Sequence, residues 1–208
     1  MLRQVPGKSE NHFHLIDKTT VERVRLFTAQ GAQLGNDTLA ANAVLMNFMS
    51  FSAYGLDGFA HAAEALVGGA VGRRDRLAFS GAVRACMKWG GVIAAMAAVV
   101  FWVGGEVIIG WLTSIDSVRE QSMEYLIWPA LMPLVAVWCF TYDGIFLGAT
   151  RGAVLRNGML ISLAGYLLAV HLLMPVYGNH GLWAAMMLFM GLRGATLAVR
   201  YPAVRNSL

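Results

Sequence analysis

Charged side chains are scarce in this sequence. Asp, Glu, Lys and Arg together make up 13% of the 208 residues, whereas 57% of the residues are hydrophobic. A soluble globular domain carries roughly a quarter charged residues. Length alone would suggest one compact soluble domain, but this composition argues against a soluble protein and favours one that lies in the lipid bilayer.

The signals of several other protein classes are also absent. The two cysteines, Cys86 and Cys139, show no CxxC or metal-binding spacing, so we expect neither a disulfide nor a metal site. The net charge of +4 is divided among short basic clusters, which argues against nucleic acid as a partner. The sequence contains no nucleophile elbow or phosphate loop, so we expect no enzyme. Residues 1–20 lack the apolar core of a signal peptide, and we expect later helices to direct insertion.

Long uncharged runs are what the sequence contains instead. They cover residues 38–56, 89–105, 125–142 and 157–192. A helix needs about 20 largely apolar residues to cross the hydrocarbon core, so the runs have the size of membrane spans and the last has room for two. We therefore predict an all-α, polytopic membrane helix bundle with about six transmembrane helices. The expected helices cover about residues 21–34, 39–70, 88–112, 123–150, 157–176 and 181–199.

Arginines in the connections predict the orientation of these helices, because cytoplasmic loops retain Lys and Arg. Residues 72–76, 151–156 and 200–205 are rich in arginine and are expected in the cytoplasm, whereas the connections at 113–124 and 177–180 are expected outside. The basic N-terminal segment also favours the cytoplasm, so both termini are expected there. This requires an even number of crossings, although helix 21–34 is short, charged and incomplete as a span.

A polar stripe runs along the expected helix 39–70. Its members recur at steps of three and four residues, which places them on one face of a helix. They are Asn47, Ser50, Tyr54, Asp57, His61 and Glu64. Such a stripe is typical of a hydrated cavity or a bundle interior, and a carboxylate beside an imidazole is suited to proton exchange. The alternative is that Asp57, His61 and Glu64 are simply solvated at a projecting helix end.

Asp143 is the acid that lies within the expected helix 123–150, which also contains Pro129 and Pro133. A carboxylate at that depth is expected to face the bundle, where it binds a cation or carries a proton. A structural acid that is paired with an arginine is the alternative. Arg193 interrupts the last expected helix, and we expect its side chain to extend to the cytoplasmic interface rather than pair with an interior acid.

Three segments make the sequence resemble a known family. They are residues 39–45 (LAANAVL), 55–68 (GLDGFAHAAEALVG) and 142–151 (YDGIFLGATR). These segments resemble the multidrug and toxic compound extrusion (MATE) family, in particular its DNA-damage-inducible protein F branch. The resemblance extends from about residue 26 to the C-terminus and covers only the second half of such a transporter.

The resemblance implies a fold and a function. Such transporters have twelve helices in two lobes, alternate access to a central cavity, and export amphipathic, often cationic compounds across the bacterial inner membrane in exchange for H⁺ or Na⁺. No other cofactor is expected. Residues 26–208 would form the C-terminal lobe, preceded by an atypical charged segment, residues 1–25. Asp143 is the first candidate for coupling, because the sodium-coupled branch has a cation-binding acid in that helix. The other candidate cavity residues are Tyr142, Asp57, His61, Glu64, Tyr54 and Asn47.

Three alternatives follow from the half-length resemblance and from the stripe. The chain could be a truncated, inactive remnant, because the N-terminal lobe is missing. It could also be a half-transporter that needs a separate N-terminal lobe or a second copy of itself. The weakest alternative is an intramembrane enzyme that uses His61 and Glu64, since zinc hydrolases of that kind need a second histidine.

Overall fold

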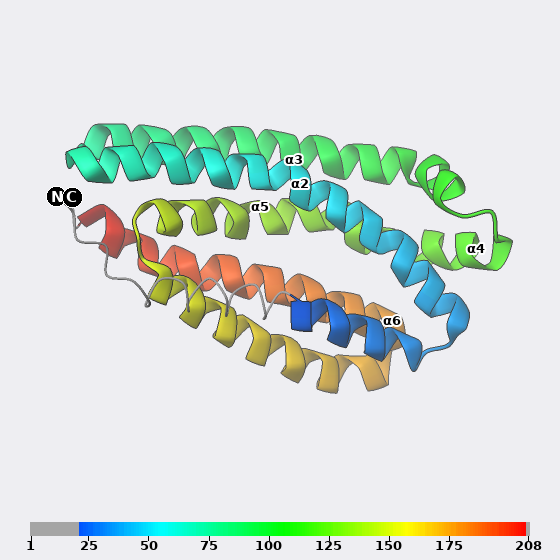
Figure 1. Cartoon of the computed structure of the whole chain (residues 1–208). Helices are drawn as coiled ribbons and strands as arrows, with labels where there is room; N and C mark the ends of the chain where they lie inside the picture. The colour runs from blue at the N-terminus through cyan, green and yellow to red at the C-terminus, as the bar shows by residue number, and fades with distance from the viewer. Residues whose placement is uncertain (1–20, 207–208) are drawn as a thin grey trace.

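The computed structural model describes residues 21–206, and within that range it contains helices and no strands (Figure 1). Residues 21–32 form the first described helix. The other helices are α2 (Asn36–Arg73), α3 (Arg76–Leu112), α4 (Asp116–Tyr125), α5 (Ile127–Gly148) and α6 (Gly152–Asn206). Gly178 has non-helical dihedral angles (φ 55°, ψ −128°), so α6 consists of two helices joined at this glycine. The predicted all-α bundle is confirmed.

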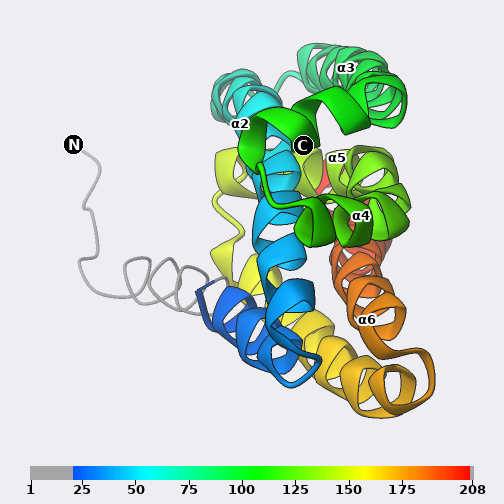
Figure 2. The same cartoon turned by 90° about the vertical axis from the view of Figure 1, so that its right-hand side faces the viewer.

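The long helices lie roughly side by side in layers (Figures 1 and 2). Helices α2 and α3 form one layer, and α5 packs beneath them. The two halves of α6 and helix 21–32 lie on the other side of α5 and α2. Helices α2, α3, α5 and α6 are each long and apolar enough to cross a membrane. The exposed surface of α3 is also apolar, with Met96, Trp102 and Val103 all more than half exposed. These features are typical of a multi-pass membrane protein.

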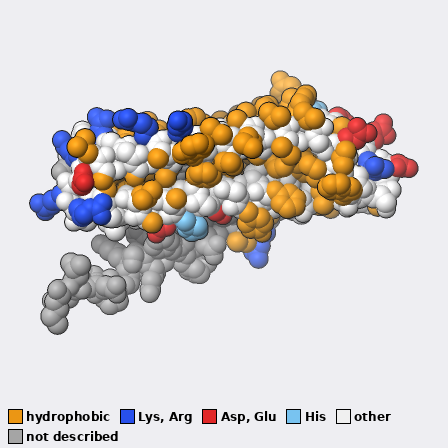
Figure 3. Space-filling model, turned by 90° about the horizontal axis from the view of Figure 1, so that it is seen from above, with side chains coloured by type: hydrophobic (Ala, Val, Ile, Leu, Met, Phe, Trp, Pro, Cys, Tyr) orange, Lys and Arg blue, Asp and Glu red, His pale blue; other side chains and the backbone are white. Residues whose placement is uncertain are grey.

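Charges gather at the two ends of the bundle. Figure 3 shows mostly Lys and Arg side chains at one end, mostly Asp and Glu side chains at the other, and a largely apolar band between them. The basic end contains the α2–α3 turn at Arg74 and the α5–α6 turn at Arg151, whereas α4, with Asp116 and Glu120, lies at the opposite end (Figure 1). Such a separation is what the sequence-based orientation requires. Which end faces the cytoplasm stays a prediction.

Several helix boundaries differ from those expected. Helix α3 begins at Arg76 rather than near Lys88, because the Asp75 side chain accepts a hydrogen bond from the backbone N–H of Ala78 and caps the helix (2.9 Å). The expected outer connection, residues 113–124, contains α4, and α5 begins at Ile127 rather than Met123. Helix α4 and the first turns of α3 were missed because they lie outside the long uncharged runs that guided the predicted bounds.

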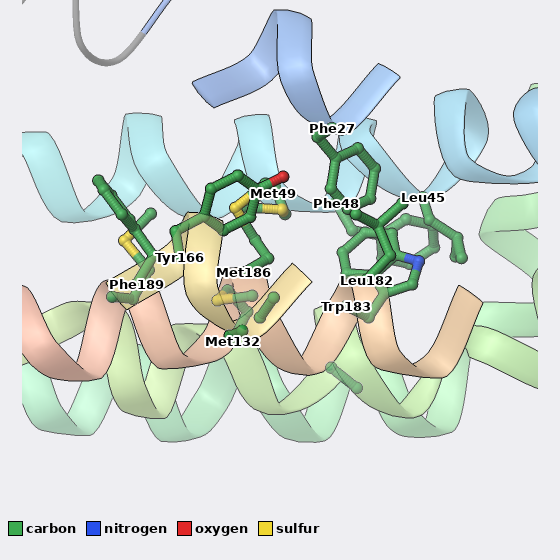
Figure 4. Packing of buried hydrophobic residues seen from close by; sticks show 14 of the residues in the cluster. Phe27, Leu45, Phe48, Met49, Met132, Tyr166, Leu182, Trp183, Met186 and Phe189 are labelled. Carbon is green, nitrogen blue, oxygen red and sulfur yellow. The ribbon is translucent and has the colours of Figure 1, made fainter. Parts of the chain in front are cut away.

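Helix 21–32 packs into the bundle despite its charges. Phe27 is 1% exposed and meets the Trp183 ring edge-on, with 5.0 Å between ring centroids (Figure 4). Beneath them, the buried amides of Asn42 and Asn179 donate to each other (2.8 and 2.9 Å), and the Trp183 indole N–H donates to Asn42 (2.8 Å). The contacts join helix 21–32, α2 and α6. Most of the predicted charged segment, residues 1–25, lies outside the described residues.

Two glycines bring α5 against α2. A Cβ atom on Gly144 would overlap the carbonyl oxygen of Ala60, and one on Gly148 would overlap the carbonyl oxygen of Glu64. The absence of side chains therefore lets the two backbones touch, as the small-residue spacing of these glycines predicts. The contact holds Asp143, which precedes Gly144, close to the polar stripe of α2.

Candidate functional site

A cavity of about 500 Å³ lies among helix 21–32, α2, α5 and α6. Its apolar lining includes four methionines, Met46, Met49, Met132 and Met190. Its charged and titratable lining residues are Arg23, Asp57, His61, Glu64, Asp143 and Arg193. The cavity thus combines an adaptable apolar wall with both signs of charge.

Asp143 and Arg193 form a largely buried ion pair in this cavity. The Arg193 Nη2 atom lies 2.6 Å from Asp143 Oδ2, and each side chain is only 14% exposed. The expectation that Arg193 extends to the interface was wrong. A Cβ atom added to Gly194 would lie only 3.5 Å from the backbone nitrogen of Cys139, so α6 lies close to α5 at this point. The short separation lets the neighbouring Arg193 reach the carboxylate of Asp143. The second oxygen, Oδ1, is buried and has no hydrogen-bond partner among the described residues.

The stripe of α2 enters the cavity only in part. Ser50, Asp57, His61 and Glu64 line it, and the Nδ1 atom of His61 lies 3.7 Å from the Glu64 carboxylate. Both members of this second pair are well exposed, at 79% for His61 and 45% for Glu64. Asp57 lies within electrostatic range of Arg193. The stripe therefore connects the buried ion pair to the open side of the cavity.

Three expected cavity residues lie elsewhere. Tyr54 is 77% exposed, and the side-chain amide of Asn47 donates to the Ala43 carbonyl (3.0 Å). Both lie at the outer edge of the stripe. The stripe residues recur at an average interval shorter than the 3.6 residues of one helical turn, so their positions shift gradually around the helix axis. Tyr142 points away from Asp143 and contacts the Tyr201 ring, with 5.9 Å between centroids, since neighbouring helical residues project about 100° apart.

Arg23 is a cavity residue that the sequence interpretation missed. It is 7% exposed, its Nη1 atom lies 3.8 Å from the Met190 sulfur, and its guanidinium lies 4.9 Å from the centre of the Phe189 ring. The sequence interpretation treated it as one of the charges that make helix 21–34 incomplete as a span and as part of the basic N-terminal segment that favours the cytoplasm. Its spacing from Phe27 could have predicted that it faces the bundle. Arg23 lies one helical turn before the buried Phe27 and therefore on the same face of the helix.

Neither the cysteines nor the acids of residues 21–206 assemble a metal site. No group of three or more His, Cys, Asp or Glu side chains in this range could hold a metal ion. Cys86 and Cys139 are free and buried, and the Cys139 thiol contacts the Met190 sulfur at 3.7 Å. The charged chemistry of the cavity is therefore carried by single carboxylates, arginines and one imidazole.

Comparison with known proteins identifies the family. The MatE family model matches residues 26–174. DNA damage-inducible protein F from Escherichia coli (strain K12) is 45% identical over 171 residues, which are 82% of this chain and 37% of that protein. The fold resembles a MOP superfamily transporter from Pyrococcus furiosus (TM-score 0.83, 12% identity) and a MATE crystal structure in the bent conformation (TM-score 0.81, 12% identity).

The match is to part of each relative. This chain covers 43% of the Pyrococcus furiosus transporter and 45% of the bent MATE structure, while 92% and 93% of this chain are aligned. The chain therefore spans less than half the length of these relatives. The family resemblance that the three sequence segments predict is confirmed by the family model and by the Escherichia coli relative. The chain belongs to the MatE family of membrane transporters.

Proposed function

We propose that this chain forms the C-terminal lobe of a secondary active multidrug efflux transporter in the bacterial inner membrane. In this proposal the assembled transporter exports toxic compounds by alternating access, in exchange for H⁺ or Na⁺. The observation that carries the proposal is the buried pair of Asp143 and Arg193 in the cavity of a MatE-family helix bundle.

The pair provides a way to exchange cations. A buried carboxylate needs a positive partner or a proton, because an unpaired charge in a poorly solvated site is costly. A coupling cation that binds Asp143 competes with Arg193 and releases it, and departure of the cation restores the ion pair. Since Asp143 belongs to α5 and Arg193 to α6, this exchange alters the contact between two helices and shifts the balance between two conformations.

The other cavity walls support binding of amphipathic compounds. Met46, Met49 and Met132 offer flexible, polarizable side chains that adapt to apolar bodies of different shape. Asp57 and Glu64 on α2 offer negative charge to cationic groups. A promiscuous site for amphipathic, often cationic substrates requires this combination of a loose apolar wall and a few charges.

We also propose that transport requires a second lobe. Repeat-built transporters form their sites between two halves, and this chain covers less than half of each compared structure. The outer edge of the polar stripe, with Asn47 and Tyr54 exposed, favours a face that another lobe covers. The second lobe is a separate N-terminal lobe or a second copy of this chain. If neither combination transports, the chain is an inactive remnant.

Replacement of Asp143 tests the proposed coupling. The chain is co-expressed with a separately encoded N-terminal lobe, and drug efflux is measured in cells with wild-type protein, Asp143→Asn and the exposed control Asp116→Asn at matched expression. We expect Asp143→Asn to abolish efflux, because the neutral amide has no proton or cation to exchange, and Asp116→Asn to leave it unchanged. Undiminished efflux by Asp143→Asn would remove the coupling role.

A further inference from the structure

Arg23 has no acidic partner among residues 21–206. Its side chain is 7% exposed, and its Nε atom is buried without a hydrogen-bond partner. The neighbours of its guanidinium are the Met190 sulfur at 3.8 Å and the face of the Phe189 ring, whose centre lies 4.9 Å away. A thioether is a weak acceptor, and an aromatic face offsets only part of the cost of burying a cation.

The acids of the same cavity do not neutralise Arg23. Asp143 pairs with Arg193, and Glu64 lies beside His61 on α2. Asp57, also on α2, interacts electrostatically with His61 and Arg193 rather than with Arg23. Arg23 and Arg193 repel each other electrostatically. The cavity contains three carboxylates and two guanidinium groups, but among the described residues no carboxylate forms an ion pair with Arg23, so the Arg23 guanidinium is left without a direct counterion.

The cavity has space for a ligand beside this charge. Its volume of about 500 Å³ is within the usual range for small-molecule sites, and Met46, Met49 and Met190 provide apolar surface next to Arg23. A guanidinium carries fixed donors that match the oxygens of a carboxylate, sulfonate or phosphate. Such an oxyanion would satisfy the orphaned Nε atom and give the Arg23 guanidinium a direct counterion.

We propose that Arg23 forms an oxyanion-binding subsite of the cavity, which takes amphipathic molecules that carry a carboxylate or a related anionic group. This inference rests on the proposed function of the cavity as a substrate site. It adds anionic ligands to the proposed substrates, because the acidic side chains on α2 would bind only cationic groups.

Three probes of the same size but different charge test the proposal. They are 2-naphthoate, the neutral 2-naphthamide and the cationic 2-naphthylmethylammonium. Equilibrium binding of each probe to the purified full chain in detergent is measured for wild-type protein, Arg23→Met and Arg25→Met. Arg25 is the matched control, because it lies on the same helix, is exposed and pairs with Glu22 at 3.2 Å. Arg23→Gln serves as a second variant if Arg23→Met does not give a monodisperse protein.

We expect wild-type protein to bind 2-naphthoate at least tenfold more tightly than 2-naphthamide. A charge-assisted hydrogen bond stabilises a complex by more than the free energy that corresponds to a tenfold change in affinity. Arg23→Met or Arg23→Gln should lose this preference, while Arg25→Met keeps it. Equal affinity of wild-type protein and the Arg23 variants for 2-naphthoate would overturn the subsite. If the cationic probe alone binds, the subsite is also overturned but the cavity remains a substrate site. If no probe binds, both the subsite and the proposed cavity function fail.

Discussion

Two pairs, each of a carboxylate and a basic side chain, line the same cavity but differ in depth. The Arg193 and Asp143 side chains are 14% exposed and 2.6 Å apart, whereas the His61 and Glu64 side chains are 79% and 45% exposed and 3.7 Å apart. Depth decides what each pair does. Loss of one partner in a buried pair leaves an unpaired charge, whereas an exposed pair is screened by water and contributes little. The buried pair is therefore the energetically significant one, and the exposed pair contributes little to stability.

Breaking the buried pair should have the largest effect on stability. Arg193→Met leaves the Asp143 carboxylate without its partner, and we expect it to lower the free energy of unfolding by about 3–5 kcal/mol. The double variant Asp143→Leu with Arg193→Met removes both charges and should be more stable than Arg193→Met alone. The stabilities of the single and the double variant are measured by thermal unfolding of the purified chain in detergent, with tryptophan fluorescence as the signal. A double variant no more stable than the single one would show that the pair is not coupled.

Separating α2 from α5 should have the next largest effect. Gly144→Ala places a methyl group against the Ala60 carbonyl, so the two backbones must move apart. We expect a loss of about 1–3 kcal/mol in the free energy of unfolding, which is typical of overpacking. Gly58→Ala on α2 is the control, because an added Cβ there meets no atom within 4 Å. Equal unfolding temperatures of the two variants would contradict the close helix contact.

Breaking the exposed pair should have the smallest effect. Glu64→Gln removes the negative charge near His61, and an exposed ion pair is worth about 0–1 kcal/mol. We expect the unfolding temperature to stay close to that of wild-type protein, and the affinity for a cationic probe to fall modestly. Titration with 2-naphthylmethylammonium measures the second effect. A loss of stability as large as that of Arg193→Met would remove the distinction between the two pairs.

The sequence predicts the helices better than it predicts their contacts. Uncharged runs identify the long helices, and regular spacing identifies Asp57, His61 and Glu64 as one wall, because both signals are local to a single helix. The partner of Asp143 depends on how closely α5 and α6 approach, which the neighbouring Gly194 permits but which no pattern within one helix specifies.

Buried polar contacts between distant helices were the hardest to predict. The amide pair of Asn42 and Asn179 and the environment of Arg23 join segments that are far apart in sequence. In the sequence, Asn179 belongs to an expected connection and Arg23 to a short charged helix, and neither pattern indicates a buried partner. Only the packed bundle shows that their polar atoms meet one another or face a cavity.

Gradient-driven transport tests the exchange at Asp143 most directly. Proteoliposomes that contain this chain with its partner lobe are loaded with drug, a gradient of H⁺ or of Na⁺ is imposed, and drug movement is compared between wild-type protein and Asp143→Asn. The exchange mechanism predicts that one of the gradients drives drug movement in wild-type protein, and that Asp143→Asn still binds drug but no longer responds. Equal gradient-driven movement in both proteins would contradict it.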